Sequence, residues 1–132
     1  MLKTGILNPQ ISNVLASLGH KDMLVVSDAG LPIPTGVERI DLAWKPNEPR
    51  YLEVLKEILK YIVVEKAILA EELKTVSPEM YTEILKVLPT NIEIQYVQHI
   101  ELKEKTKSAK AVIRTGEFTP YPSVILVSGC AY

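Results

Sequence analysis

A histidine and an aspartate flank the first apolar segment of the chain, and together they could exchange protons near neutral pH. His20 follows Gly19, which ends a helical pattern, and Asp28 follows the apolar run 23–27 and enters a loop rich in glycine and proline. Histidine has an unperturbed pKa of roughly 6.5, so it can donate or accept a proton under physiological conditions. An acid at the exit of a buried strand lies where α/β sheets usually bind their ligands. The pair indicates a small proton-transfer site for a polar molecule.

Each candidate residue also has a purely structural interpretation. His20 can interact favourably with a helix dipole and cap carbonyl groups, and Asp28 can stabilise a turn through its own backbone. His99 follows an alternating polar and apolar segment and is compatible with a surface position. Tyr121 lies between two prolines and can be a packed aromatic. Taken one at a time, these residues leave both interpretations open.

Several other chemistries lack their sequence signals. The chain contains no GxGxxG or GxxxxGK[ST] loop, no CxxC or HExxH pair and no GxSxG motif. Two histidines and one cysteine also argue against a closed zinc site. Dinucleotide, nucleoside-triphosphate, metal and covalent-serine chemistry are therefore unsupported. Acid–base catalysis without a cofactor or metal is the chemistry that remains.

The composition is that of an ordinary globular domain. The 132 residues are 47% hydrophobic and 23% charged with a formal net charge of −1, so we expect a single domain over 1–132. A near-neutral charge gives no basis for binding nucleic acid or an anionic membrane. No apolar run approaches the ~20 residues that span a bilayer. The N-terminal segment lacks a signal-peptide core and Cys130 is the single cysteine, so we expect a cytoplasmic protein.

Helical and strand patterns alternate along the chain. Asn8 and Pro9 form a good helix start, and apolar residues then recur at helical spacing up to Gly19. Further helices are expected after Pro49 and from Pro78, and the mixed charge run after 100 is typical of a solvated helix face. Strands are expected at 23–27, 37–42, 66–70, 92–98, 110–115 and 124–128. This alternation predicts one layered α/β domain with a mostly buried sheet flanked by helices.

Four blocks of sequence resemble the D-ribose pyranase family, the small sugar isomerases of bacterial ribose uptake, which are related to L-fucose mutarotase. The blocks are KTGILNPQISNVLASLGH, VVSDAGLPIP, VQHIELK and AVIRTGEFTPY, and they occur in order over nearly the whole chain. The resemblance implies an isomerase that interconverts the β-pyranose and β-furanose forms of D-ribose. The ring would open and reclose by general acid–base catalysis, without cofactor or metal.

The resemblance also assigns roles to individual residues. It implies that His20 is the proton donor, and that the substrate-binding residues are Asp28, His99, Lys103, Tyr121, Pro122 and Ser123. The family usually has a small residue and an asparagine where this chain has Pro122 and Ser123. A serine hydroxyl has a shorter reach and one donor fewer than an asparagine amide. This departure leaves two alternatives open, a mutarotase for another monosaccharide and a non-catalytic sugar-binding or regulatory module.

The resemblance further implies an assembly. Members form homo-oligomeric rings, pentamers that pair into a decamer, and a neighbouring subunit supplies the Tyr121 segment to each site. We therefore expect D-ribose as the small-molecule partner and a second copy of the chain as the macromolecular one.

Overall fold

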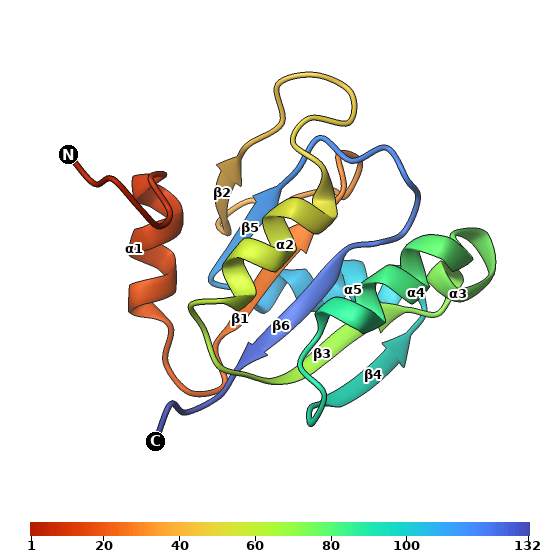
Figure 1. Cartoon of the computed structure of the whole chain (residues 1–132). Helices are drawn as coiled ribbons and strands as arrows, with labels where there is room; N and C mark the ends of the chain where they lie inside the picture. The colour runs from red at the N-terminus through yellow and green to blue at the C-terminus, as the bar shows by residue number, and fades with distance from the viewer.

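A six-stranded mixed sheet runs through the centre of the computed structural model, which describes all 132 residues (Figure 1). Its strands lie in the order β2-β5-β1-β6-β3-β4. The strands are β1 (Met23–Ser27), β2 (Glu38–Asp41), β3 (Val64–Ala70), β4 (Glu93–Val97), β5 (Ala111–Arg114) and β6 (Val124–Ser128). The helices are α1 (Pro9–Ser17), α2 (Tyr51–Leu59), α3 (Glu72–Val76), α4 (Pro78–Val87) and α5 (His99–Lys105), with a 3₁₀ turn at Thr106–Ser108. None of these helices is long and apolar enough to cross a membrane.

Strand direction decides which loops lie at each of the two edges of the sheet where its strands begin and end. Strand β6 is antiparallel to both of its neighbours, β1 and β3. The remaining pairs, β1 with β5, β2 with β5 and β3 with β4, are parallel. Five strands therefore run in one direction and end at the same edge, where β6 begins. Loops that leave β1, β4 and β5 meet at this edge.

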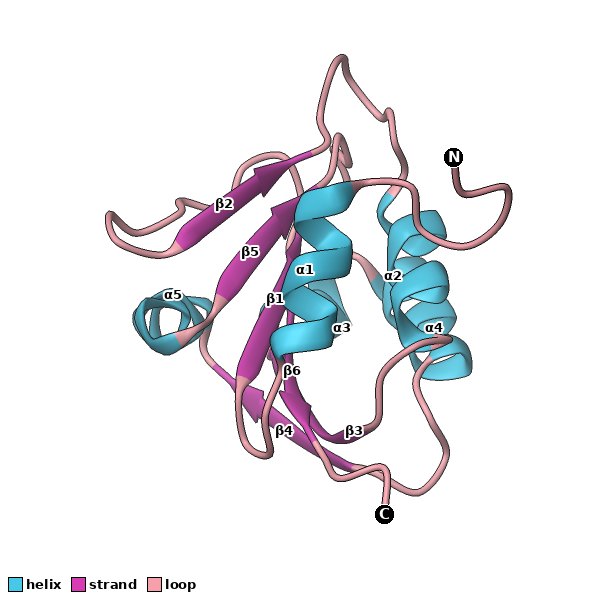
Figure 2. Cartoon of the chain, turned by 90° about the vertical axis from the view of Figure 1, so that its left-hand side faces the viewer, coloured by secondary structure: helices cyan, strands magenta, loops and turns pink.

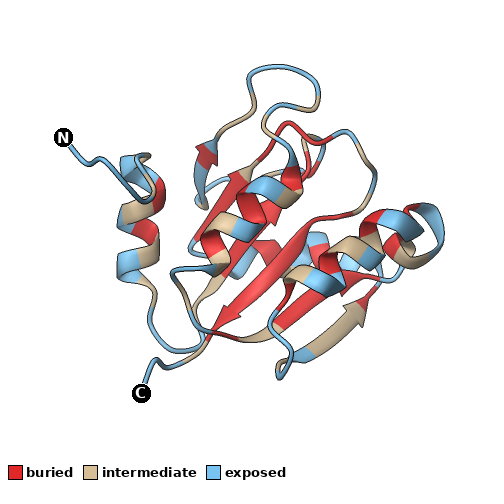
Figure 3. Cartoon of the chain, viewed as in Figure 1, coloured by how far each residue is buried: buried red, intermediate tan, exposed pale blue.

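The sheet is covered on both faces. Successive strand residues point to opposite faces, so Leu24 and Val26 of β1 join the larger core with α1, α2 and α4, while Val25 joins the smaller core with Leu102 of α5. Figure 2 shows α1, α2 and α4 on one side of the sheet and α5 on the other. Strands β1 and β6 are buried along almost their whole length (Figure 3), which explains their continuous apolar sequences.

The elements expected from the sequence are confirmed, with small shifts at their ends. Asn8 caps α1 by accepting a hydrogen bond from the backbone N–H of Ile11 at 2.9 Å, and Pro9 is the first helical residue. Two features were not expected. Helix α3 is only five residues long and too short for an apolar period, and α5 begins directly at His99.

A close backbone contact fixes the loop before α2 against the segment after β5. Asn47 donates its backbone N–H to the carbonyl oxygen of Gly116 at 2.7 Å, and Gly116 donates to that of Pro49 at 3.0 Å. The Asn47 side chain accepts from the backbone N–H of Phe118 at 3.0 Å. A Cβ atom on Gly116 would lie 2.3 Å from the carbonyl oxygen of Glu48. Only glycine allows the two segments to approach so closely.

We predict that Gly116→Ala lowers the free energy of unfolding by about 1–3 kcal/mol, because the added methyl group meets backbone atoms that cannot rotate away. Urea unfolding followed by circular dichroism measures the change. Gly30→Ala is the matched control, since its Cβ would lie 3.5 Å from its nearest neighbour, Asp28 Oδ1. The control should change stability by no more than about 0.5 kcal/mol, and equal effects in both variants would contradict the close packing at Gly116.

Candidate active site

A cavity of about 540 Å³ opens at the sheet edge where the five parallel strands end. Three parts of the chain form it: the loop after β1, the first residue of α5, and the long segment between β5 and β6. Its lining consists of residues 28–31, His99, Arg114 and residues 117–121. The cavity therefore brings together three of the residues selected from the sequence, Asp28, His99 and Tyr121.

Asp28 is held in one position at the exit of β1. Its Oδ1 atom accepts a hydrogen bond from the backbone N–H of Gly30 at 2.8 Å, and its Oδ2 atom accepts one from Ser123 Oγ at 2.9 Å. The same Ser123 oxygen accepts the backbone N–H of Asp28 at 3.1 Å. A carboxylate offers about four acceptor sites. Asp28 therefore keeps acceptor capacity for the hydroxyl groups of a ligand.

His99 is the first residue of α5 and lies against Tyr121. Its backbone N–H donates to both carboxylate oxygens of Glu72, at 3.1 and 2.9 Å, which fixes the start of the helix. Its ring meets the Tyr121 ring edge-on, with centroids 4.9 Å apart. Its Nδ1 atom is buried and has no hydrogen-bond partner. The His99 side chain lines the cavity, so the imidazole can hydrogen-bond a ligand there.

Burial, together with the positive charge of Lys103, lowers the pKa of His99 below its usual value of 6.5, although Asp28 and Glu72 act in the opposite direction. The neutral imidazole therefore predominates at pH 7. In that form one ring nitrogen donates a hydrogen bond and the other accepts one.

The backbone of the Tyr121 segment is tightly constrained. Tyr121 adopts a positive φ of 68°, which is uncommon for a residue with a side chain. The carbonyl oxygen of Pro120 accepts a hydrogen bond from Ser77 Oγ at 2.7 Å, which ties the segment to the start of α4. Such backbone outliers persist where surrounding contacts hold them, and they gather at functional sites.

Arg114 and Glu117 line the cavity but were not selected from the sequence. Arg114 Nε donates to the carbonyl oxygen of Ala29 at 3.0 Å, and its Nη1 donates to both Asp41 oxygens at 3.0 and 3.1 Å. Because it bridges two loops, Arg114 fixes the position of the backbone beside Asp28. Nothing in its sequence surroundings marks it, except that it lies within the block AVIRTGEFTPY.

Glu117 is almost completely buried behind the cavity. Its carboxylate accepts the backbone N–H of Tyr51 at 3.1 Å, accepts Thr119 Oγ1 at 2.9 Å and pairs with Arg50 at 3.1 Å. It thereby supplies the cap that Arg50, the N-cap residue of α2, does not provide. A buried carboxylate needs several such donors to remain ionised without a large cost.

Three residues expected to bind substrate do not line the cavity. Pro122 and Ser123 are buried, and Ser123 lies behind Asp28 with its hydroxyl group already bonded to it. Both residues directly precede β6, which begins at Val124, and their contact with a ligand stays a prediction. Lys103 is exposed on α5 and acts on the site through its charge.

His20 lies at the opposite edge of the sheet from this cavity. The five residues of β1, at about 3.3 Å each, separate His20 from Asp28 by roughly 17 Å or more. Its Nε2 atom lies 3.0 Å from Glu65 Oε2. Tyr121, by contrast, shares the cavity with Asp28 within one chain. A single chain therefore leaves His20 apart from the cavity, and the supply of a segment by a neighbouring copy stays a prediction.

The arrangement is suited to binding a polar, uncharged ligand and to moving protons. The cavity presents a fixed carboxylate, a neutral imidazole and a phenol, and no group of three His, Cys, Asp or Glu side chains is placed to hold a metal ion. Side chains that both donate and accept hydrogen bonds suit a ligand that carries several hydroxyl groups.

Comparison with known proteins gives a consistent result. A model of the RbsD / FucU transport protein family matches residues 1–131. A protein named D-ribose pyranase from Coprothermobacter proteolyticus is 52% identical over the full length of both chains. Another from Geobacillus thermodenitrificans is 52% identical, covering 98% of this chain and 97% of the relative.

Solved structures agree with the sequence comparison. Bacillus subtilis RbsD complexed with D-ribose matches the whole of both chains with a TM-score of 0.95 and 45% identity. The fucose mutarotase from Streptococcus pneumoniae, in complex with L-fucose, has a TM-score of 0.82 and 21% identity, covering 99% of this chain and 100% of that one. The second likeness shows a shared fold.

We predict that Ser123→Ala lowers the free energy of unfolding by about 1–3 kcal/mol, because the backbone N–H and one carboxylate oxygen of Asp28 lose a buried partner. Urea unfolding measures the loss. Ser17→Ala serves as the control, since the hydroxyl of Ser17 is exposed and donates only to the carbonyl oxygen of Asn13 in the same helix. An effect no larger than the control's would contradict the positioning role of Ser123.

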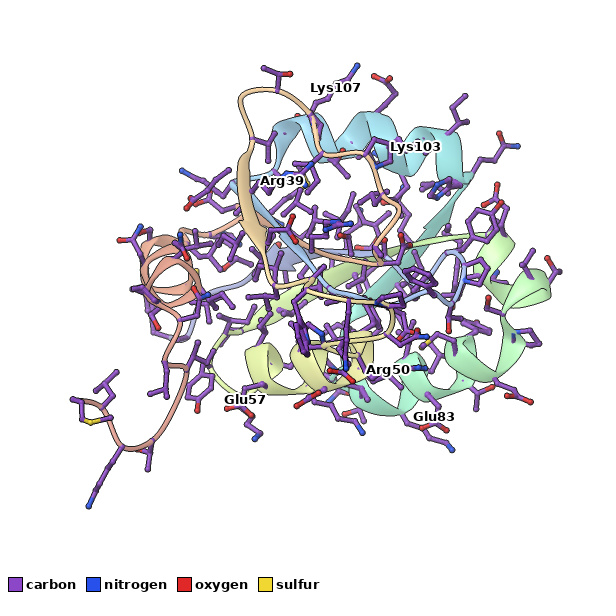
Figure 4. All side chains as sticks on the ribbon, turned by 90° about the horizontal axis from the view of Figure 1, so that it is seen from above. Arg39, Arg50, Glu57, Glu83, Lys103 and Lys107 are labelled. Atoms are coloured by element: carbon purple, nitrogen blue, oxygen red, sulfur yellow. The ribbon has the colours of Figure 1, made fainter.

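We also predict that Lys103→Met raises the pKa of His99, because it removes a positive charge that opposes protonation. NMR titration resolves this readily, since the chain has only two histidines. Lys107→Met is the control, because Lys107 lies beyond the end of α5, in the 3₁₀ turn Thr106–Ser108, and pairs with Glu104. Figure 4 labels both lysines. An unchanged titration of His99 in Lys103→Met would refute the assigned cause.

The lowered pKa of His99 also makes the stability of the protein depend on pH. The folded pKa of His99 lies below its unfolded value, so the unfolded state binds the proton more tightly. The contribution of His99 to stability is present above about pH 6.5 and is lost as the pH falls through the folded pKa. Lys103→Met should make this loss smaller.

Proposed function

This chain belongs to the RbsD / FucU transport protein family, and on that premise we propose that it is an isomerase that interconverts the β-pyranose and β-furanose forms of D-ribose. The observation that carries the proposal is the cavity of Asp28, His99 and Tyr121 in a chain that matches the ribose complex of Bacillus subtilis RbsD over its full length at 45% identity. The full-length relatives named D-ribose pyranase support it.

The reaction is a redistribution of protons. The anomeric hydroxyl loses a proton while the ring oxygen gains one, so the bond between the ring oxygen and the anomeric carbon breaks and the anomeric carbon and its remaining oxygen become an aldehyde. After rotation, a different hydroxyl attacks the aldehyde carbon and loses its proton, and the carbonyl oxygen gains one. Electrons and protons balance without an oxidant. Well-placed acid–base groups each contribute typically about 10²–10⁴-fold to such a step.

The geometry supports a division of roles within the cavity. Asp28, held by Gly30 and Ser123, accepts hydrogen bonds from sugar hydroxyls on its remaining acceptor sites. His99, neutral at pH 7, lines the same cavity and can donate or accept a hydrogen bond with a further hydroxyl. The Tyr121 ring packs edge-on against the His99 ring and lines the cavity.

The departure of this chain at Pro122 and Ser123 does not point to another sugar. Both residues are buried and outside the cavity lining, and Ser123 is hydrogen-bonded to Asp28. The substitution therefore changes what supports the carboxylate rather than what the sugar contacts, which favours D-ribose over a different monosaccharide. We further propose a cytoplasmic location, since Cys130 is free and exposed and free thiols persist in reducing compartments.

His20 acts as proton donor in this proposal by entering the cavity of a second copy. Exposed apolar side chains lie at both ends of the sheet. Phe118 lines the cavity and Ile100 follows His99 in α5, while Tyr61 and Val63 line the depression that contains His20. Two different surfaces that meet in this way form a head-to-tail contact, which closes into a ring when the rotation permits. We therefore propose a homo-oligomeric ring, doubled into a decamer, with one site at each contact.

A mixing experiment tests both the activity and the shared site. His20→Ala and Asp28→Asn should each lower ribose ring interconversion by about 10²-fold or more, as measured by NMR saturation transfer. Co-expressed under two tags and purified through both, the two variants should recover up to about one quarter of wild-type activity, because half of the sites retain Asp28 and half of the adjoining copies retain His20.

Each variant co-expressed with a differently tagged copy of itself is the control and should stay inactive. A mixture without activity would contradict the shared site, because sites built within one chain cannot complement. Wild-type rates in both single variants would contradict the proposed activity of the cavity.

A further inference from the structure

His20 lies on a turn whose backbone is held by three hydrogen bonds. The backbone N–H of Gly19 donates to Asp22 Oδ2 at 2.8 Å, and that of Asp22 donates to the carbonyl oxygen of Gly19 at 3.1 Å. Lys21 adopts a positive φ of 74° and donates its backbone N–H to the carbonyl oxygen of Ser128 at 2.9 Å. With the backbone held, the remaining freedom of His20 is the orientation and tautomer of its ring.

Glu65 at the start of β3 contacts that ring. Its Oε2 atom lies 3.0 Å from His20 Nε2, and its other oxygen accepts a hydrogen bond from the Lys21 ammonium. Those two hydrogen bonds lower the pKa of Glu65, so its carboxylate is ionised at neutral pH. An ionised carboxylate can only accept hydrogen bonds, so the contact requires His20 to carry its proton on Nε2.

The strand is built to aim Glu65 at this turn. The pairing of β3 with β6 is regular except at Glu65, where the register shifts between Val64 and Lys66. A bulge of this kind adds one unpaired residue and redirects its side chain. Gly129, which donates its backbone N–H to the carbonyl oxygen of Val63 at 2.9 Å, lies nearby, and a Cβ atom on it would come within 3.1 Å of Val63 Cγ1 and 3.4 Å of Glu65 Cβ. The irregularity and the glycine together make room for the carboxylate beside His20.

The remaining groups around the turn do not compete for the His20 ring. Lys110 lies 3.8 Å from Asp22 Oδ2 on the far side of the turn. Tyr61 and Tyr132 line the same depression as His20, but Tyr61 donates its hydroxyl to Glu57. Glu65 is therefore the one carboxylate bonded to the imidazole.

We infer that Glu65 is the positioning residue of the proton donor: its carboxylate accepts the Nε2–H of His20 and leaves Nδ1 to exchange the proton with the sugar. The inference rests on the proposed role of His20. In the protonated ring Nε2–H stays on Glu65 while Nδ1–H passes to the ring oxygen of the sugar. The neutral ring then has a lone pair on Nδ1 that can take a proton back when the ring recloses.

The tautomer of His20 tests the inference without reference to activity. Long-range ¹H–¹⁵N spectra of the intact protein at alkaline pH distinguish the two ring nitrogens, and His99→Asn identifies the His20 signals. Wild-type protein should show the Nε2–H tautomer of His20. Glu65→Gln should shift the ring toward a mixture, because a side-chain amide can donate to Nε2 as well as accept from it. Glu65→Asp should restore the Nε2–H tautomer in part.

Measurements of kcat and KM provide a second test of the role of Glu65. Glu65→Gln should lower kcat about tenfold with little change in KM, since Glu65 does not contact the sugar, and Glu65→Asp should recover part of kcat. Lys21→Met is the matched control, because it removes the other partner of Glu65 and leaves the carboxylate on His20. Lys21→Met should keep the Nε2–H tautomer of His20, and its kcat should lie within about twofold of the wild-type value. Urea unfolding establishes that all variants are folded.

An unchanged tautomer in Glu65→Gln would overturn the inference. A changed tautomer with unchanged kcat would also overturn it, provided that His20→Ala is inactive. A changed tautomer together with a fully active His20→Ala would instead count against the proposed role of His20, while leaving the orientation of its ring by Glu65 supported.

Discussion

The pairing of β6 with β1 and β3 determines where every functional group of this protein lies. β6 is antiparallel to both neighbours and joins the two parallel groups, β2-β5-β1 and β3-β4, into one sheet with a common direction. Its five residues are all buried, so it belongs to both hydrophobic cores. Because the five other strands end at one edge, connections that are far apart in the sequence meet there and enclose a single cavity.

The carboxylates at that edge are held by hydrogen bonds. A buried carboxylate is costly unless donors surround it; Asp28 accepts from the backbone N–H of Gly30 and from Ser123 Oγ, and Glu117 accepts from the backbone N–H of Tyr51 and from Thr119 Oγ1. Those donors also remove conformational freedom. The result is a site whose carboxylate and imidazole are oriented before a ligand arrives, which lowers the entropic cost of binding.

The direction of β1 also determines which residues one chain can bring together. The strand begins beside His20 and ends at Asp28, so these two residues lie at opposite edges of the same sheet. The proposed ring of head-to-tail contacts would remove this separation by placing the turn of one copy at the cavity of the next. Catalysis would then depend on assembly, since each contact would supply half of the chemistry.

Much of the fold could be predicted from the sequence because its signals are local. Asn8 and Pro9 specify a helix start through a cap, and the apolar runs 23–27 and 124–128 specify strands that are buried on both faces. The same local reasoning selected Asp28 at the exit of its strand, whereas His99 and Tyr121 were selected through the resemblance to the family. It missed α3, which is too short to show an apolar period.

The sequence by itself determined the fold class, the family and the acid–base character of the site. Strand order and direction, which depend on pairing between distant segments, were decided only in the tertiary structure. That pairing buried Ser123 behind Asp28, brought Arg114 and Glu117 to the cavity and aimed Glu65 at His20. It also separated His20 from Asp28, although only seven residues lie between them in the sequence. Proximity in a chain is not proximity in space when the intervening residues form an extended strand, because each residue then adds about 3.3 Å.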